Sequence, residues 1–395
     1  VNYGLGLKKD LFNFSVSQSY EFANNSSYHK DTGQADYMTD LLTGAGYGGR
    51  KNKLNHEGRF YHQAYLSPAV YYKDDDPNVE EDYGCTVSDP DNPLLIPPCV
   101  VQELNRNFGI DYLMSYPFSR FSRVEGGFNY DYFIRQDIVT DQNGDEESHN
   151  YRSQNLLKPY VKYVWDNTRW FYTHPVSGSR IYVKYDIAPY KGSINSNDFA
   201  YEMLTFDSRS YMEISYKSKI SFAARVYGGS SWGREKRRFL IGGIPWLFSG
   251  DDYLINTHYE DNMDVSDEFY FMNNYVFPIR GHEIASKYGK NALLFNYELR
   301  LPFLIYYFPA IKYIGQLFGV FFIDAGVAWN DIYPEFSNQD SWNLSDSEGW
   351  IMSYGFGPRF YFFGMPWKLD YAWQYNPYKG TTSSRHWYLS VGFDF

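Results

Sequence analysis

The last ten residues, HWYLSVGFDF (residues 386–395), decide the fold class of this chain. Apolar and polar side chains alternate along the segment, and in an extended strand successive side chains point to opposite faces. One face of the segment is therefore apolar and the other polar, which predicts a β-strand between two different environments. The apolar face carries Trp387, Leu389, Val391, Phe393 and Phe395.

Upstream segments repeat the alternation, among them WKLDYAWQYN (residues 367–376) and NALLFNYELRL (residues 291–301). A soluble β-sandwich also alternates, but its strands average about five or six residues. The segments in this chain run to about ten residues, the length of a tilted strand that crosses a bilayer. Since every backbone polar group must be paired inside lipid, spanning strands have to form a closed barrel. The sequence predicts an all-β fold, a transmembrane antiparallel β-barrel.

Composition and charge support a membrane barrel and exclude other classes. Of the 395 residues, 21% are aromatic, with 41 Tyr, 31 Phe and 10 Trp. Aromatic residues favour sheet and form the girdles of outer-membrane barrels. The uninterrupted apolar runs are shorter than the ~18 residues of a spanning helix. The net charge of -11 would repel a phosphate backbone, so nucleic acid is excluded as a partner.

The connections predict how the strands are arranged within one barrel domain that covers residues 1–395. We predict 12 to 14 strands in total, because residues 1–22 fit either one strand or a hairpin and residues 58–72 fit either a wall strand or a projecting hairpin. Long extracellular loops are predicted at 231–289 and, with acidic composition, at 73–100. From residue 101 onward eleven strands are predicted, at 101–116, 119–136, 154–168, 179–190, 204–217, 219–230, 290–302, 316–329, 349–362, 365–376 and 385–395.

Three motifs follow one another in the C-terminal half. They are FLIGG (residues 239–243), FPIRGH (residues 277–282) and FGVFFIDAGVAW (residues 318–329). In these motifs and their order, the sequence resembles the BamA, TamA and FhaC superfamily of outer-membrane assembly and translocation barrels. The family carries an aromatic residue at the loop tip where this chain has His282, and it places the GG pair closer to the tip than Gly243 lies to Ile279.

The resemblance implies that the long loop folds back into the barrel lumen. The loop-tip motif would be Ile279, Arg280 and Gly281, and its arginine would meet Asp324 on the wall. From the residues alone, Asp324 falls on the polar phase of its strand and so faces the lumen. Because we expect the lumen to be partly hydrated, the predicted contribution of this charge pair is on the order of 1 to 3 kcal/mol. Glu298 and Arg300 also face inward and are candidates for the same network.

Two further resemblances concern the last strand and two segments in the N-terminal third of the chain. The terminal residues Trp387, Leu389, Val391, Phe393 and Phe395 resemble the C-terminal aromatic signal by which outer-membrane barrels are recognised for insertion. The segments NYGLGL (residues 2–7) and SYPFSRFSRVE (residues 115–125) resemble, more weakly, a branch whose barrel follows a periplasmic TolB-like propeller. Sixteen strands are usual in the superfamily, so the resemblance implies that an N-terminal periplasmic domain and the first strands are missing from this chain.

The cysteines and the motif search indicate a disulfide but no catalytic or metal site. Cys85 and Cys99 flank a Pro- and Asp-rich stretch, and in an oxidising compartment we predict a disulfide between them. The acidic stretch around them reads as a solvated surface loop, with divalent cations as the alternative ligand. Neither a metal-ligand spacing nor a nucleophile motif occurs, so we expect no metal, no cofactor and no catalytic residues. A hydrolase assembled from distant lumen residues is the residual enzymatic alternative.

These expectations combine into one function and two alternatives. The resemblance implies a non-enzymatic barrel in the outer membrane of a Gram-negative bacterium that inserts outer-membrane proteins or translocates polypeptides. Its partners would be outer-membrane lipid and lipopolysaccharide, client polypeptides, and periplasmic or lipoprotein subunits. The alternatives are a structural barrel that anchors a periplasmic propeller or partner complex, and a passive diffusion channel.

Overall fold

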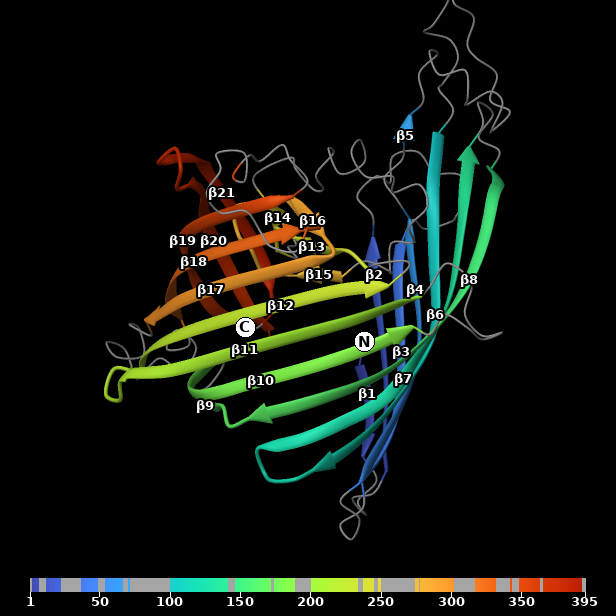
Figure 1. Cartoon of the computed structure of the whole chain (residues 1–395), viewed down its shortest axis with the longest axis horizontal. Coiled ribbons are helices and arrows are strands. Elements are labelled where there is room, and N and C mark those ends of the chain that lie inside the picture. Colours follow the sequence, from blue (N-terminus) through green and yellow to red (C-terminus); the bar gives the residue numbers. More distant parts are fainter. Residues whose placement is uncertain are drawn as a thin grey trace, which may run out of the picture.

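The wall of the molecule is one curved antiparallel sheet (Figure 1). In the computed structural model, fourteen strands of at least 11 residues build this wall, and the five-residue β1 adds a fifteenth at one end. Fourteen is the upper end of the predicted range of 12 to 14, and β1 takes the described wall strands one beyond that range. The structure describes residues 2–6, 12–22, 37–48, 54–66, 70–71, 100–140, 146–171, 174–188, 200–233, 237–244, 248–249, 274–276, 278–301, 317–331, 342, 348–362 and 365–392.

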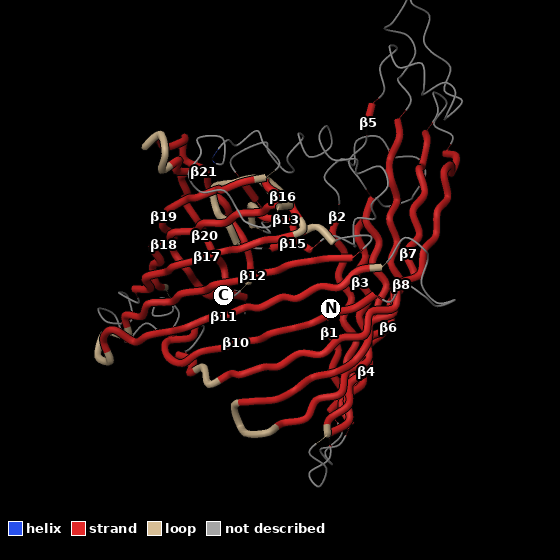
Figure 2. The backbone as a smooth tube through the Cα atoms, viewed as in Figure 1, coloured by secondary structure: helices blue, strands red, loops and turns tan. Residues whose placement is uncertain are grey.

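Figure 2 shows that almost all of the described backbone is strand. None of the described residues forms a helix long and apolar enough to span a membrane. The strands are β1 (Asn2–Gly6), β2 (Phe12–Phe22), β3 (Tyr37–Gly48), β4 (Asn55–Leu66), β5 (Val70–Tyr71), β6 (Val100–Pro117), β7 (Ser122–Thr140), β8 (Glu146–Asp166), β9 (Arg169–Phe171), β10 (His174–Ala188), β11 (Tyr201–Ser215), β12 (Ile220–Gly233), β13 (Phe239–Ile241), β14 (Phe248–Ser249), β15 (Asn274–Val276), β16 (Lys287–Gly289), β17 (Asn291–Leu301), β18 (Phe318–Trp329), β19 (Gly349–Phe362), β20 (Met365–Asn376) and β21 (Thr381–Val391).

Neighbouring wall strands pair in chain order as an antiparallel meander. The order is β1, β2, β3, β4, β6, β7, β8, β10, β11, β12, β17, β18, β19, β20 and β21. Within the described residues, the far edge of β21 pairs with the short loop strand β14. A meander of long antiparallel strands is the architecture that the sequence predicts.

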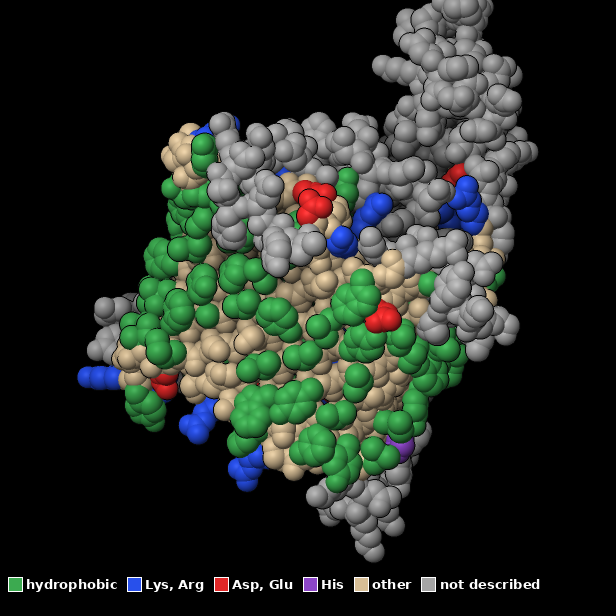
Figure 3. Space-filling view, in the orientation of Figure 1, with side chains coloured by type: hydrophobic (Ala, Val, Ile, Leu, Met, Phe, Trp, Pro, Cys, Tyr) green, Lys and Arg blue, Asp and Glu red, His purple; other side chains and the backbone are tan. Residues whose placement is uncertain are grey.

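Burial follows the predicted alternation on both faces of the wall. Along β17 the even-numbered residues from Ala292 to Arg300 are buried, and the odd-numbered residues are more exposed. Large apolar side chains remain exposed on the outer face, and Figure 3 shows them spread over the wall. This outer apolar surface is what lipid contact requires. Among the exposed residues are Val183, Leu204, Phe206, Phe321, Ile323 and Phe356.

A second, three-stranded sheet lies against the inner face of the wall. In it, β13 pairs in parallel with β15 and in antiparallel orientation with β16. Its side chains Phe239, Ile241 and Val276 belong to the same buried cluster as the wall residues Leu294 and Ile351. The loop between β12 and β17 is thus anchored by an apolar core inside the barrel.

The structure refines the predicted strand boundaries. Eleven long strands follow residue 100 within the described ranges, in the order predicted. The strands predicted at 119–136 and 154–168 were too short, because β7 runs to Thr140 and β8 already begins at Glu146. The polar residues at the ends of both strands concealed this extension, since the prediction relied on an alternating apolar face. Residues 2–22 contain the hairpin of β1 and β2, and β4 is a wall strand between β3 and β6.

Candidate functional site: the charge cluster at the loop tip

The loop tip is held close to the wall by its own backbone. Ile279 donates a backbone hydrogen bond of 2.9 Å to Gly243 O, which ties the tip to the end of β13. The Ile279 side chain is fully buried in the core cluster shared with the wall. The residue before Arg280 is therefore held by a backbone hydrogen bond and by the apolar core, independently of any charge.

Gly281 lets the backbone turn next to the arginine. Its φ of +87° is in the left-handed region that favours glycine. An added Cβ would approach the Cβ atoms of Ala372 and Ser353, at 3.1 and 3.4 Å. Any larger residue here would strain the turn and crowd β19 and β20, so glycine is required for this close approach.

Arg280 donates three hydrogen bonds to the carboxylate of Asp324 on β18. Its Nε donates to Asp324 Oδ2 at 2.7 Å and its Nη2 donates to Oδ1 at 2.8 Å, a bidentate pair. The backbone N–H of Arg280 adds a third hydrogen bond, of 3.1 Å, to Oδ2. The guanidinium also lies over the Phe322 ring, 3.6 Å from its centroid. A planar, five-donor group is what this arrangement uses, and a lysine cannot reproduce it.

A second ion pair continues the cluster toward the other end of the barrel. Arg280 Nη1 donates to Glu298 Oε1 at 2.8 Å, and Glu298 Oε2 accepts from Arg300 Nη2 at 2.8 Å. Arg300 Nη1 then donates to Pro175 O at 3.2 Å, on β10. Two arginines and two carboxylates thus form a charge-balanced chain across the lumen. We call Arg280, Glu298, Arg300 and Asp324 the loop-tip cluster.

Asn296 is a member that the sequence analysis did not single out. Its Nδ2 donates to Asp324 Oδ1 at 2.8 Å and to Pro278 O at 2.7 Å, so it joins the wall carboxylate to the loop backbone. The signal was present, because Asn296 lies on the same inward phase of β17 as Glu298. The contact of Arg300 with Pro175 had no sequence signal, since 125 residues separate the two.

The cluster is dry. The side chains of Arg280, Glu298, Arg300 and Asp324 are all at most 2% exposed. The expectation of a partly hydrated pair was therefore wrong for this site, because the loop sheet covers it. Breaking a buried pair leaves an uncompensated charge and costs about 3 to 5 kcal/mol, above the range predicted from the sequence.

Electrostatics at the loop tip favour a permanently charged arginine. Burial by itself lowers the pKa of Arg280, but the neighbouring Asp324 and Glu298 carboxylates outweigh it and raise the pKa well above the usual value. All five hydrogen-bonding positions of the guanidinium need acceptors, and two carboxylates supply most of them. The two arginines and two carboxylates of the cluster balance in charge and bond to one another, so the cluster serves to attach the loop to the wall.

His282 fills the position next to the tip. Its Nε2 lies 3.0 Å from Met352 O on β19, and the residue is buried. Burial lowers the pKa of His282 to about 4, although the Met352 carbonyl acts in the opposite direction. The imidazole is thus neutral at pH 7 and donates to the carbonyl. Gln374 of β20 contributes on the other side, with Nε2 donating to Gly281 O at 2.8 Å.

The remaining predicted residues lie elsewhere. Trp387, Leu389 and Val391 are on β21, far from the loop-tip cluster in sequence and on the outward phase of the strand. Phe393, Phe395, Cys85 and Cys99 lie outside the described residues, as does the acidic segment at 73–99. Among the residues that the structure describes, no group of three His, Cys, Asp or Glu side chains is placed to hold a metal ion.

Comparisons with known proteins place these features in a family. The model of the Omp85 superfamily domain matches residues 103–395. A solved structure of BamA from Haemophilus ducreyi lacking POTRA domains 1-3 is similar at 13% identity and a TM-score of 0.46, over 95% of this chain and 75% of the other. CdiB from Escherichia coli is similar at 10% identity and a TM-score of 0.52, over 96% of this chain and 56% of the other. No curated protein sequence matches significantly.

Proposed function

The chain belongs to the Omp85 superfamily of outer-membrane β-barrels, and from this premise we propose that it inserts outer-membrane proteins or translocates polypeptides, without enzymatic activity. It spans just over half the length of the CdiB chain and three quarters of the BamA chain. Client polypeptide would bind at the backbone edge of β21, and the loop-tip cluster would hold the loop against the wall.

The observation that carries the proposal is the strand added to the edge of β21. β14 pairs with β21 in antiparallel register, Phe248 opposite Leu389 and Ser249 opposite Tyr388. An edge strand exposes a row of N–H and C=O groups, and such a row is a template for an incoming extended peptide. The edge of β21 thus has the geometry to accept a polypeptide segment by backbone hydrogen bonds.

The test is to lock this edge with a disulfide. We expect Phe248→Cys with Leu389→Cys, in a background with Cys85→Ser and Cys99→Ser, to crosslink β14 to β21 because paired antiparallel strands bring Cα atoms to about 4.5–5.5 Å. The oxidised protein, reconstituted in lipid vesicles, should stop inserting or transferring an unfolded outer-membrane polypeptide, and reduction should restore the activity.

A matched control lies within the wall. Ser179 and Ser210 are opposite each other on β10 and β11, with their hydroxyl oxygens 3.5 Å apart. Crosslinking Ser179→Cys to Ser210→Cys fixes two strands that are already paired, so client handling should continue at the unlocked rate. Full activity of the β14–β21 crosslinked protein would refute a role for this edge.

A structural barrel that anchors a partner complex is the second candidate. The observation that favours it is the part of the lumen that the loop occupies, where Phe239, Leu240 and Ile241 of β13 are fully buried. Apolar side chains in this part of the lumen also argue against a passive diffusion channel. If the unlocked protein moves no client yet pulls down a periplasmic complex, the anchor is the better description.

A further inference from the structure

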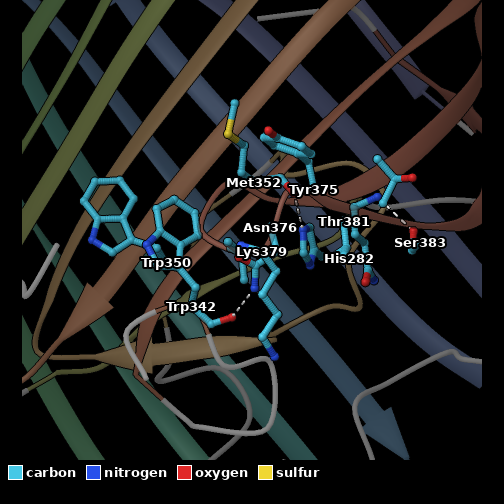
Figure 4. Close-up of a pocket in the computed structure, with 12 residues that line it drawn as sticks. His282, Trp342, Trp350, Met352, Tyr375, Asn376, Lys379, Thr381 and Ser383 are labelled. Atoms are coloured by element: carbon cyan, nitrogen blue, oxygen red, sulfur yellow. Dashed lines mark hydrogen bonds between the residues drawn. The ribbon is translucent and has the colours of Figure 1, made fainter. Parts of the chain in front are cut away.

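A small cavity opens where two wall strands separate. The ladder between β19 and β20 extends to Ser353 opposite Gln374. Beyond that pair both strands continue toward the end of the barrel that carries the loop, and the described residues show no further pairing between them. The separation holds a cavity of about 290 Å³, shown in Figure 4, with His282 at its inner side.

One wall of the cavity is a pair of stacked tryptophans. The rings of Trp342 and Trp350 lie 5.8 Å apart between centroids, with an interplanar angle of 27°. Asn376 Nδ2 donates to Trp342 O at 3.3 Å, which fixes the backbone of Trp342 to the end of β20. Trp350 is almost fully buried, so Trp342 presents the accessible aromatic surface.

The opposite side of the cavity is polar. Lys379 lies in the turn between β20 and β21, Thr381 and Thr382 begin β21, and all three are exposed. Together they supply one ammonium and two hydroxyl groups, all able to donate hydrogen bonds. Asn376 is already engaged, since its Oδ1 accepts from the backbone N–H groups of Tyr378 and Lys379 and so shapes the turn.

We propose that this cavity binds a saccharide of one or two pyranose rings. A pyranose has an apolar C–H face that packs on an aromatic ring and an equatorial rim of hydroxyls that need both donors and acceptors. The cavity offers both, and its volume lies at the lower end for small-molecule sites. Lys379 is the one cation among the lining residues, and His282 is neutral at pH 7, so a polyphosphate finds too little positive charge.

The position of the cavity suits a glycan ligand. It lies at the end of the barrel opposite the tight turns at residues 118–121 and 216–219, and therefore on the extracellular side in an outer-membrane barrel. The same sugar chemistry reaches this face in two forms, as the glycan of lipopolysaccharide in the membrane and as free oligosaccharide in the medium. Both present a pyranose ring to Trp342.

Binding is measured on the folded chain in detergent by tryptophan fluorescence and calorimetry. The probes are glucose, galactose and N-acetylglucosamine, then maltose, lactose and chitobiose. We expect saturable binding of at least one probe, weakened tenfold or more by Trp342→Ala because the stacking surface is lost. Trp170→Ala is the matched control, since Trp170 is 55% exposed on β9, at the other end of the barrel.

The outcomes separate the alternatives. Equal binding by the Trp342→Ala and Trp170→Ala variants would overturn the proposal, as would an absence of binding to every probe by wild-type protein that shows a folded, heat-modifiable band. Repeating the titration in vesicles with and without lipopolysaccharide distinguishes the sources. Competition by lipopolysaccharide would assign the membrane glycan, and its absence would assign free oligosaccharide.

Discussion

Two of the charge clusters among the described residues of the inner face differ in what they join. The loop-tip cluster connects the loop to β17 and β18 through Arg280, Glu298 and Asp324. A second cluster, which we call the wall cluster, connects β4, β6, β7 and β8, strands that are already neighbours in the sheet. It consists of Tyr61, Asn107, Asp131 and Lys158.

The wall cluster is wetter and simpler. Asp131 accepts hydrogen bonds from Tyr61 Oη and from Asn107 Nδ2, the latter at 3.0 Å, and its Oδ2 lies 2.9 Å from Lys158 Nζ. The Lys158 side chain is 24% exposed, whereas Arg280 is 2% exposed. Water can therefore compensate a loss in the wall cluster, and only protein atoms can do so at the loop tip.

Hydrogen bonds to a buried carboxylate have different structural roles in the two clusters. In the wall cluster, backbone hydrogen bonds already pair the four strands, and the side-chain contacts add stability to strands that are paired without them. At the loop tip no ladder joins Arg280 to β18, so its charged hydrogen bonds make the direct contact with that strand, beside the Ile279 contacts that hold the tip to the inner sheet and the core. Removing one partner should therefore have a large effect at the tip and a small, local effect in the wall.

The largest difference is expected between Asp324→Asn and Asp131→Asn. Asp324→Asn leaves Arg280 with a single carboxylate partner in a dry site, and we expect the free energy of unfolding to fall by about 3 to 5 kcal/mol. Asp131→Asn leaves Lys158 partly hydrated, and a loss of about 1 to 2 kcal/mol follows from hydrogen bonds to a charged group. Denaturant unfolding in detergent, followed by gel mobility with and without heating, measures both.

A loop readout sharpens this test. In Asp324→Asn the loop should become accessible to protease, while in Asp131→Asn it should stay protected, because only the first substitution releases the tip. Equal losses in the two variants, with a protected loop in both, would show that the two clusters do the same job.

The second effect is a pH dependence confined to the loop tip. The folded-state pKa of His282 is lowered to about 4 from 6.5. Below pH 6.5 the released imidazole takes up a proton that the docked one refuses, so docking weakens as pH falls from 6.5 to 4 and levels off below. The full span corresponds to about 3 kcal/mol. Lys287, His386 and Asp324 are the charged or titratable neighbours.

Protease protection of the loop, followed between pH 7 and pH 4, checks this dependence. His282→Asn keeps a donor for Met352 O and removes the titration, so its protection should be flat over this window. A wild-type loop that stays equally protected at pH 4 and pH 7 would contradict the prediction.

The third effect is steric and compares two glycines. An added Cβ at Gly326 of β18 would lie 2.3 Å from Ile279 Cδ1, and Ile241 and Leu294 close in behind it. Gly326→Ala should push the tip away and cost about 1 to 3 kcal/mol. An added Cβ at Gly58 of β4, the strand that carries Tyr61, meets its nearest atom at 4.0 Å, so Gly58→Ala should be close to neutral. Thermal unfolding of both variants measures the difference.

Much of the wall could be predicted from sequence because alternation is local. The inward phase of β17 and β18 follows from period two alone, and it placed Asp324 and Glu298 on the inner face. The full length of β7 and β8, which extend past β10 in Figure 1, could not be predicted, since their outer ends lack the apolar face that marks a strand. The position of Arg280 came from the family resemblance, because loop conformation depends on contacts that no local pattern encodes.

Dryness was the part of the site that the sequence concealed. Whether Arg280 and Asp324 meet in water or away from it depends on the inner sheet of β13, β15 and β16. That sheet pairs segments separated by more than 30 residues, and its short strands carry no alternating signal. For a dry pair the expected cost of removing one partner is the larger one, about 3 to 5 kcal/mol.

The smallest expected effect is that of Tyr61→Phe in the wall cluster. The substitution removes one hydroxyl donor from Asp131, which keeps Asn107 and Lys158 as partners. A single hydrogen bond contributes about 0.5 to 1.5 kcal/mol, and the paired strands β4 and β6 do not depend on it. The free energy of unfolding should fall by about 1 kcal/mol or less, with the loop still protected from protease.

Asn296→Ala is the counterpart of Tyr61→Phe at the loop tip, because it removes an amide that bridges Asp324 and the Pro278 carbonyl. If the loop-tip cluster attaches the loop to the wall and the wall cluster only stabilises strands that are already paired, Asn296→Ala should expose the loop to protease and Tyr61→Phe should not. Each variant loses only a neutral hydrogen-bond donor.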